Sequence, residues 1–257
     1  MIYRAELRKI LGDMRAYWFE LLFGNLNVLV TFVGLYFAFG VYGDDTPRRI
    51  VFFSGVLFWY FGVHGTDLLT TIMEEEMESG TMDQLLMSRS SLAGILSGKI
   101  MAQFTADALK GLIVFPLLIL LTRTNLLSAG SEGLAVLLLV FIGSLVAMFG
   151  VGATLAGLAL VYKRVSALGA ATTNFLLYLV GMTVPLAELP VWARSVGRAL
   201  PMSWGGEIVM DVFRGGNVRA APVVGMTVSA LLWVAVGMIV FRIMQRRSRV
   251  LGSTSQY

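Results

Sequence analysis

The chain has 257 residues, of which 57% are hydrophobic and 14% charged, and its mean hydropathy is +0.77. Soluble domains carry about 25% charged residues, so this chain lacks the polar groups to cover a water-facing globule, and it is far too apolar to be disordered. The absence of cysteine excludes disulfides and thiolate catalysis, and the single histidine excludes a metal site built from several histidines of one chain. The composition therefore indicates a membrane protein.

The first 20 residues are amphipathic and precede the first apolar stretch. One helical face carries the apolar side chains, while most charged side chains fall on other faces. The residues of this face are Tyr3, Leu7, Ile10, Met14, Tyr17 and Leu21. This pattern predicts a cytoplasmic helix that lies in the membrane interface. The alternative is a simple extension of the first span.

Six stretches are long and apolar enough to cross a bilayer, which takes about 20 residues. They are residues 21–41, 50–69, 100–121, 134–161, 165–185 and 222–241. Lysine and arginine are more numerous on the side of the two termini, which places both termini in the cytoplasm of a multi-pass protein of the cell (inner) membrane. The positive net charge is thus explained by the membrane topology. We expect the protein to lie in the lipid bilayer and not to bind nucleic acid. A small-residue stripe in the fourth span, which includes Gly143, Gly150 and Gly157, predicts close helix packing.

The cytoplasmic loop 70–99 between the second and third spans carries an acidic run and then a turn signal at Gly80. Thr81 and Gln84 form a capping-box pattern, which predicts a short helix at about 82–88. That helix would present Leu and Met side chains. It would either pack on the ends of neighbouring spans or dock in a groove of a cytoplasmic protein.

This loop resembles that of the ABC-2-type transporter permeases, in which an acidic stretch precedes E-x-x-x-G-T-x-x-x-L-L and a later G-K. The matching residues here are Glu76, Gly80, Thr81, Leu85, Leu86, Gly98 and Lys99. Ser88-Arg89-Ser90 stands where the family often has proline. Leu189-Pro190-Val191-Trp192 and the later Leu200-Pro201 resemble the family's segment before the last span, and the resemblance covers essentially the whole chain.

The resemblance implies a transporter subunit without ATPase activity. Two permease subunits, as a homodimer or heterodimer, would pair with two copies of an ABC ATPase, which would bind ATP and Mg; this chain itself would bind no cofactor. The ATPase-coupling residues would be Glu76, Gly80, Thr81, Met82, Asp83, Leu85 and Leu86, and the N-terminal helix would also contact the ATPase. The expected activity is export of a hydrophobic or amphipathic substrate such as a drug, lipid or glycan.

Two pairs of polar residues lie in the spans. Asp107 and Lys110 are three residues apart near the membrane midplane, where they would form a structural ion pair or line a pathway. His64 and Asp67 have the same spacing in the second span. An ion-coupled secondary transporter that uses Asp107 and Lys110 is therefore an alternative function. An intramembrane enzyme is a weaker one, because the motifs H-E-x-x-H and G-x-S-x-G are both absent.

An external hairpin, residues 187–221, precedes the last span, and a cytoplasmic tail, 242–257, follows that span. The hairpin predicts two short, re-entrant helices at the outer interface. Pro190, Trp192 and Pro201 would belong to an outer gate or to a cap without gating. We thus expect an all-α protein with an interfacial helix at 1–20 and a single six-span transmembrane domain at 21–257.

Overall fold

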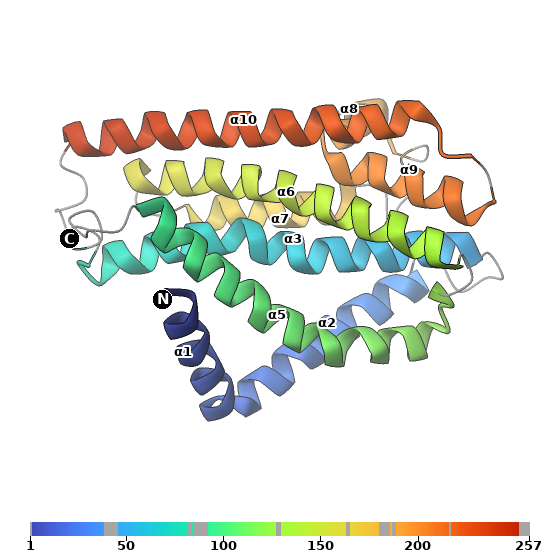
Figure 1. Ribbon diagram of the computed structural model, residues 1–257, viewed down its shortest axis with the longest axis horizontal. Coiled ribbons are helices and arrows are strands. Elements are labelled where there is room, and N and C mark those ends of the chain that lie inside the picture. Colours follow the sequence, from blue (N-terminus) through green and yellow to red (C-terminus); the bar gives the residue numbers. More distant parts are fainter. Residues whose placement is uncertain are drawn as a thin grey trace.

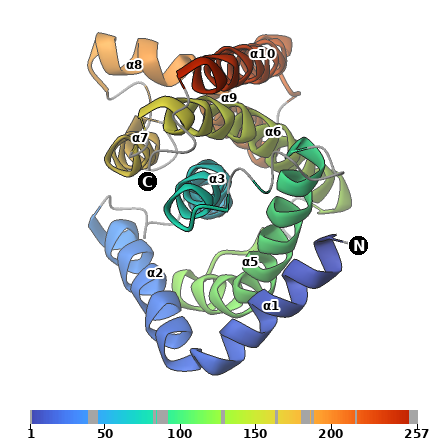
Figure 2. The same ribbon diagram turned by 90° about the vertical axis from the view of Figure 1, so that its left-hand side faces the viewer.

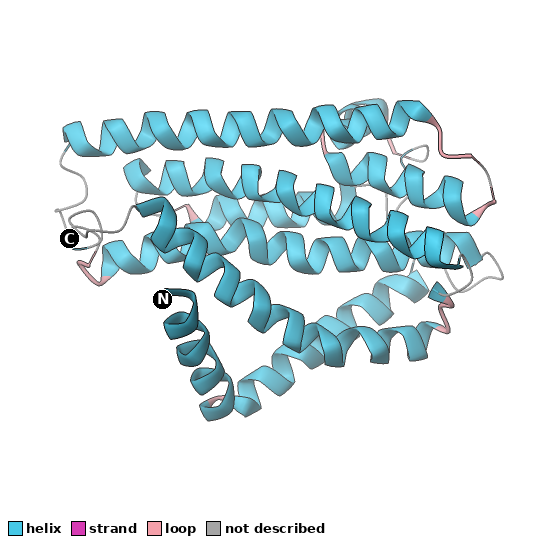
Figure 3. Ribbon diagram, viewed as in Figure 1, coloured by secondary structure: helices cyan, strands magenta, loops and turns pink. Residues whose placement is uncertain are grey.

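The structure, a computed structural model, describes residues 2–38, 46–81, 84, 92–126, 130–162, 165–179, 186, 189–215 and 217–251. The elements in this part of the chain are helices, and it contains no strand, which confirms the all-α fold (Figure 3). The helices are α1 (Ile2–Ala16), α2 (Trp18–Ala38), α3 (Thr46–Glu78), α5 (Leu92–Thr122), α6 (Gly130–Tyr162), α7 (Ser166–Leu179), α8 (Val191–Arg198), α9 (Pro201–Phe213) and α10 (Ala220–Leu251).

Four segments of the described helices are long and apolar enough to cross a membrane: Trp18–Ala38, Gly94–Thr122, Gly130–Tyr162 and Ala220–Ser248. They correspond to the first, third, fourth and sixth predicted spans. The second predicted span lies within α3, whose 33 residues reach about 50 Å at 1.5 Å per residue. The 14-residue α7 covers the first part of the fifth predicted span, and the rest of that span lies outside the described residues.

The long helices α3, α6 and α10 run side by side and form the body of the molecule (Figure 1). Glycines allow α6 and α10 to approach each other closely. A Cβ atom on Gly237 would lie 2.2 Å from the backbone oxygen of Gly150, and one on Gly157 would lie 2.9 Å from the Cα of Phe241. The small-residue stripe predicted in the fourth span is thus a packing surface, because only glycine leaves room for the facing backbone.

Helix α1 lies across the direction of α3, α6 and α10, and α2 leaves its end at a different angle (Figure 1). The two helices meet at Tyr17, so α1 is a separate helix and not an extension of the first span. Tyr3, Leu7, Ile10 and Met14 are partly buried, whereas Arg4, Arg8 and Lys9 are exposed. The first four residues of the predicted amphipathic face therefore pack on the protein, whereas Tyr17, near the end of that face, is exposed.

Helix α5 is the surface on which α1 packs (Figure 2). A Cβ atom on Gly98 would lie 2.9 Å from the Cγ2 of Ile2, so the absence of a side chain at Gly98 lets the two helices meet. The hydroxyls of Tyr3 and Thr105 form a hydrogen bond of 3.2 Å between the same helices. Packing at Gly98 and the hydroxyl contact at Thr105 thus hold α1 against the first half of α5.

The short helices α8 and α9 lie at the end of the bundle opposite the turn that follows α3 (Figure 1). Met202 and Val209 of α9 are buried in a core shared with Phe58 of α3 and Met148 of α6. The two helices predicted at 187–221 are present, and α9 is packed into the bundle rather than lying on its surface. Helix α10 continues to Leu251, ten residues past the predicted end of the last span at 241, so it extends into the segment expected to be a tail.

Candidate functional site

The turn after α3 forms the base of the predicted coupling loop. Gly80 has φ +67°, the left-handed region in which only glycine is unstrained. The backbone N–H of Gly80 donates to the carbonyl of Met77 at 3.1 Å, and that of Thr81 donates to the carbonyl of Glu76 at 3.0 Å. This pair of bonds is a Schellman motif, which satisfies the last carbonyls of the helix. The Gly-Thr of the sequence pattern is thus the C-terminal cap of α3.

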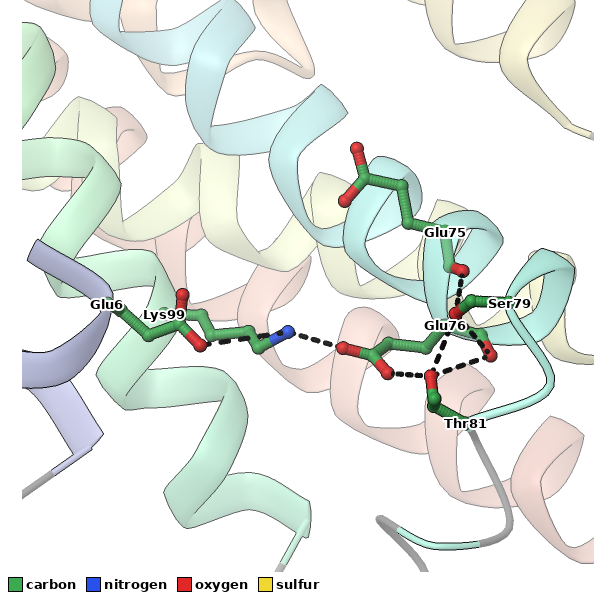
Figure 4. A network of polar contacts seen from close by, with 6 residues as sticks. All are labelled: Glu6, Glu75, Glu76, Ser79, Thr81 and Lys99. Atoms are coloured by element: carbon green, nitrogen blue, oxygen red, sulfur yellow. Dashed lines mark hydrogen bonds and ion pairs between the residues drawn. The ribbon is translucent and has the colours of Figure 1, made fainter. Parts of the chain in front are cut away.

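The Glu76 carboxylate is the centre of a polar network at this turn (Figure 4). One carboxylate oxygen receives a hydrogen bond from the ammonium of Lys99 on α5, and the other receives one from the hydroxyl of Thr81. The Thr81 hydroxyl is also 2.8 Å from that of Ser79. Lys99 lies between Glu76 and Glu6 of α1, with its Nζ 4.0 Å from the Glu6 Oε1. We call Glu6, Glu76, Thr81 and Lys99 the loop-base network.

The environment of the loop-base network keeps Glu76 ionised. Partial burial by itself raises the pKa of the Glu76 carboxyl, but the hydrogen bonds from Lys99 and Thr81 lower it, and the charges of Lys99 and Lys9 add to that effect. The net result is a pKa below the ordinary value. The side chains of Glu76 and Lys99 are 15% and 19% exposed. The ion pair therefore lies in a setting where attraction between charges is screened less than at an open surface.

The structure brings together Glu76, Thr81 and Lys99, and it places Gly80 at the turn that joins them. Met82, Asp83, Leu85 and Leu86 lie outside the described residues. The side-chain contacts of Thr81 run back to the end of α3, whereas the sequence predicted a capping box with Gln84, whose side chain is exposed.

Sequence reasoning missed Glu6. It lies three residues after Tyr3 and four before Ile10, and so on the face of α1 that packs on the protein. An acidic residue on the apolar face of an amphipathic helix was the available signal, because such a residue needs a cationic partner across the interface.

The intramembrane pair is present within α5. The Lys110 ammonium and the Gln103 amide both donate to Oδ1 of Asp107, each at 3.1 Å. The Asp107 side chain is 1% exposed, and its Oδ2 has no hydrogen-bond partner among the described residues. His64 and Asp67 lie on α3, and their side chains are outside the part of the chain that the structure describes.

The three residues of the predicted outer gate lie around α8 and α9. Pro190 directly precedes α8, Trp192 is on α8 with its side chain 64% exposed, and Pro201 is buried in the first turn of α9. After α9, the Arg219 guanidinium contacts Asp211 at 2.9 Å and Glu207 at 3.4 Å. The hydrogen bond from Arg219 lowers the pKa of the Asp211 carboxyl.

Among the described residues, no group of three or more His, Cys, Asp or Glu side chains is arranged to hold a metal ion. The loop-base network is a set of paired charges and hydroxyls at a helix end, held together by ion pairs and hydrogen bonds. The arrangement links α3, α5 and α1 through side-chain contacts.

The fold defines a polytopic helical membrane protein with an amphipathic helix at its N-terminal end. The family model described as ABC-2 type transporter matches residues 2–213, which include α1 through α9 and the whole loop-base network. The chain belongs to the ABC-2 type transporter family and is the permease subunit, a membrane protein that has no ATPase activity of its own. A search of curated proteins finds no match to the sequence.

Proposed function

We propose that this chain forms half of the pore of an ATP-driven exporter in the cell (inner) membrane. It pairs with a second permease subunit, which is identical or related. Two ABC ATPase subunits bind this pair, and the segment that follows Gly80 is the docking site on this chain. The observation that carries the proposal is the loop-base network. It joins the end of α3, the start of α5 and helix α1 at the point where the proposed docking segment leaves the bundle.

The network supports a route for mechanical coupling. ATP binds to the partner ATPase and favours the state of that ATPase for which ATP has the higher affinity. ATP therefore acts on the permease only when the permease follows the movement of the ATPase. A displaced docking segment would pull on the Schellman turn and on Glu76. Lys99 would pass that movement to α5 and, through Glu6, to α1. The proposed coupling residues Met82, Asp83, Leu85 and Leu86 would provide the contact surface itself.

The proposed topology has six spans, with α3 and α7 as the second and fifth. Both termini are cytoplasmic in this proposal. The start of α1, the end of α10 and the turn after α3 all lie toward one end of the molecule, whereas α8 and α9 lie toward the other, which supports this orientation (Figure 1). The outer hairpin, with Pro190, Trp192 and Pro201, would then close the external side of the route.

The alternative, an ion-coupled transporter that uses Asp107 and Lys110, makes a different prediction about the energy source. Within α5 these two side chains neutralise each other, which supports a structural role for the pair. An ATP-driven exporter requires its ATPase for transport, whereas an ion-coupled carrier works without one.

Co-purification and transport measurements test the proposal. The permease is expressed together with a candidate ABC ATPase subunit, purified by a tag on the permease, and reconstituted in proteoliposomes. We expect the ATPase to co-purify, Leu85→Asp to remove it, and Glu132→Gln, an exposed change on α6, to have no effect. Substrate transport driven by an ion gradient in liposomes that lack any ATPase would contradict the proposal.

A further inference from the structure

Two adjoining cavities lie between α1 and the helices on which it packs. One has a volume of about 440 Å³ and the other about 720 Å³, and both are lined by Ile10, Asp13, Glu75 and Gln103. The first extends toward Lys99 of the loop-base network, and the second extends along α2 toward Lys110. We call the combined space the α1 trough. It is large enough for the head of an organic molecule, since ligand pockets commonly span 300–1,000 Å³.

The α1 trough carries a surplus of negative charge. Two of its lysines are already neutralised, because Lys99 is paired with Glu76 and Lys110 with Asp107. Asp13, Glu20 and Glu75 also line the trough, and none of them has an ion-pair partner among the described residues. The remaining cation of the lining is Lys9, whose charge acts on Glu76.

Two further observations favour a cationic occupant. The rings of Tyr17 and Tyr60 line the larger cavity, and aromatic faces attract organic cations. Gln103 and Lys110, which line the larger cavity, both donate to the buried Asp107, whose Oδ2 has no hydrogen-bond partner among the described residues. A buried carboxylate oxygen without a donor is costly, so added positive charge nearby is favourable.

We propose that the α1 trough binds the cationic head of an amphipathic substrate that reaches it from the cytoplasmic leaflet. The charged head would lie among Asp13, Glu20 and Glu75, against the tyrosine rings. The apolar part would lie along Ile10, Met14 and Val28, which line the same space. This inference rests on the proposed exporter function and narrows its substrate class from amphipathic molecules in general to cationic ones.

Binding of a matched set of ions tests the inference directly. Tetraphenylphosphonium and tetraphenylborate have nearly the same size and shape and opposite charge. Each is titrated by equilibrium dialysis into the permease–ATPase complex in lipid nanodiscs, and partition into empty nanodiscs is subtracted. We expect saturable binding of tetraphenylphosphonium and at least tenfold weaker binding of tetraphenylborate. Equal binding of the two ions, or no saturable binding of the cation, would overturn the inference.

Charge-neutral variants locate the site. Asp13, Glu20 and Glu75 are all exposed, so Asp13→Asn, Glu20→Gln and Glu75→Gln remove charge without opening a core. We expect each variant to weaken tetraphenylphosphonium binding about tenfold, equivalent to ~1.4 kcal/mol, and Glu132→Gln, at the other end of the molecule, to leave it unchanged. Unaltered binding in all three trough variants would place the cation elsewhere. Co-purification of the ATPase is scored in the same samples, so a failure of the exporter function is seen separately.

Discussion

The two lysines of α5 form ion pairs that differ in which helices they join. Lys99 reaches Glu76 at the end of α3 and Glu6 on α1, so its contacts join three helices. Lys110 reaches Asp107, three residues earlier on the same helix. The first pair constrains how helices move relative to one another. The second neutralises a buried carboxylate, and its ion pair and hydrogen bonds among the described residues lie within α5.

The largest effect expected to sharpen this comparison comes from Lys99→Ala. Glu76 would keep its charge, partly buried, without its main partner. We expect a loss of about 2–3 kcal/mol in the free energy of unfolding, somewhat less than for a fully buried pair. We also expect at least a tenfold loss of ATP-dependent transport per folded complex. Thermal unfolding and transport in proteoliposomes measure the two effects.

Lys99→Arg is the matched control for this variant, because arginine retains the positive charge and the reach to both carboxylates. We expect Lys99→Arg to retain most of the ATP-dependent transport of the wild type. Wild-type transport in Lys99→Ala would show that the loop-base network does not transmit movement.

The next largest effect is expected from Lys110→Met. Asp107 would then lie buried without its cation, at a cost of about 2 kcal/mol in the free energy of unfolding. In the double variant Asp107→Asn/Lys110→Met, which removes both charges together, transport per folded molecule should stay near the wild-type level, because the ion pair and hydrogen bonds of Asp107 lie within α5 among the described residues. Unfolding in nanodiscs and ATP-dependent transport are measured together, and the double variant Asp107→Asn/Lys110→Met should recover most of the stability. A selective loss of transport in a stable double variant would instead place the pair in a pathway.

A smaller effect is expected from Gly80→Ala. The residue has φ +67°, and a side chain in the left-handed region costs about 1–2 kcal/mol. Nothing lies within 4 Å of the added Cβ, so the cost is backbone strain alone. We expect the unfolding temperature to fall and Gly80→Asn to be less harmful, since asparagine tolerates this conformation. Equal stability of Gly80→Ala and the wild type would mean that the turn rearranges without cost.

The smallest change over the physiological range is expected from pH. The folded-state pKa of Glu76 lies below its unfolded value, so its stabilising contribution is fully present above the unfolded pKa and is lost as pH falls through the folded pKa. The stability difference between the wild type and Glu76→Gln should therefore be constant between about pH 8 and pH 5 and shrink below about pH 4.5. Thermal unfolding across this range measures it. A difference that changes between pH 6 and 8 would assign the effect to another group.

The loop-base turn was predictable to the extent that its determinants are local. Glu76, Gly80 and Thr81 lie within six residues, and a Schellman cap needs only a helix end and a glycine. The partner of Glu76 on α5 was visible only as a G-K pattern, and Glu6 was not identified. The contact of Glu6 depends on how α1 packs against Gly98 and Thr105, and that of Glu76 depends on how the end of α3 lies beside α5. No short sequence window contains either arrangement.

The sequence by itself determined the membrane class, the apolar stretches and the amphipathic face of α1, because hydropathy and helical periodicity are properties of short segments and the bilayer sets the segment length. Only the tertiary structure decided which charges meet across helices, that α9 is packed into the bundle, and that acidic side chains of α1, α2 and α3 line one trough. These contacts join residues far apart in the chain. They exist because side chains and glycine backbones let particular helix faces approach one another. The hydropathy of a segment does not determine which faces pack together.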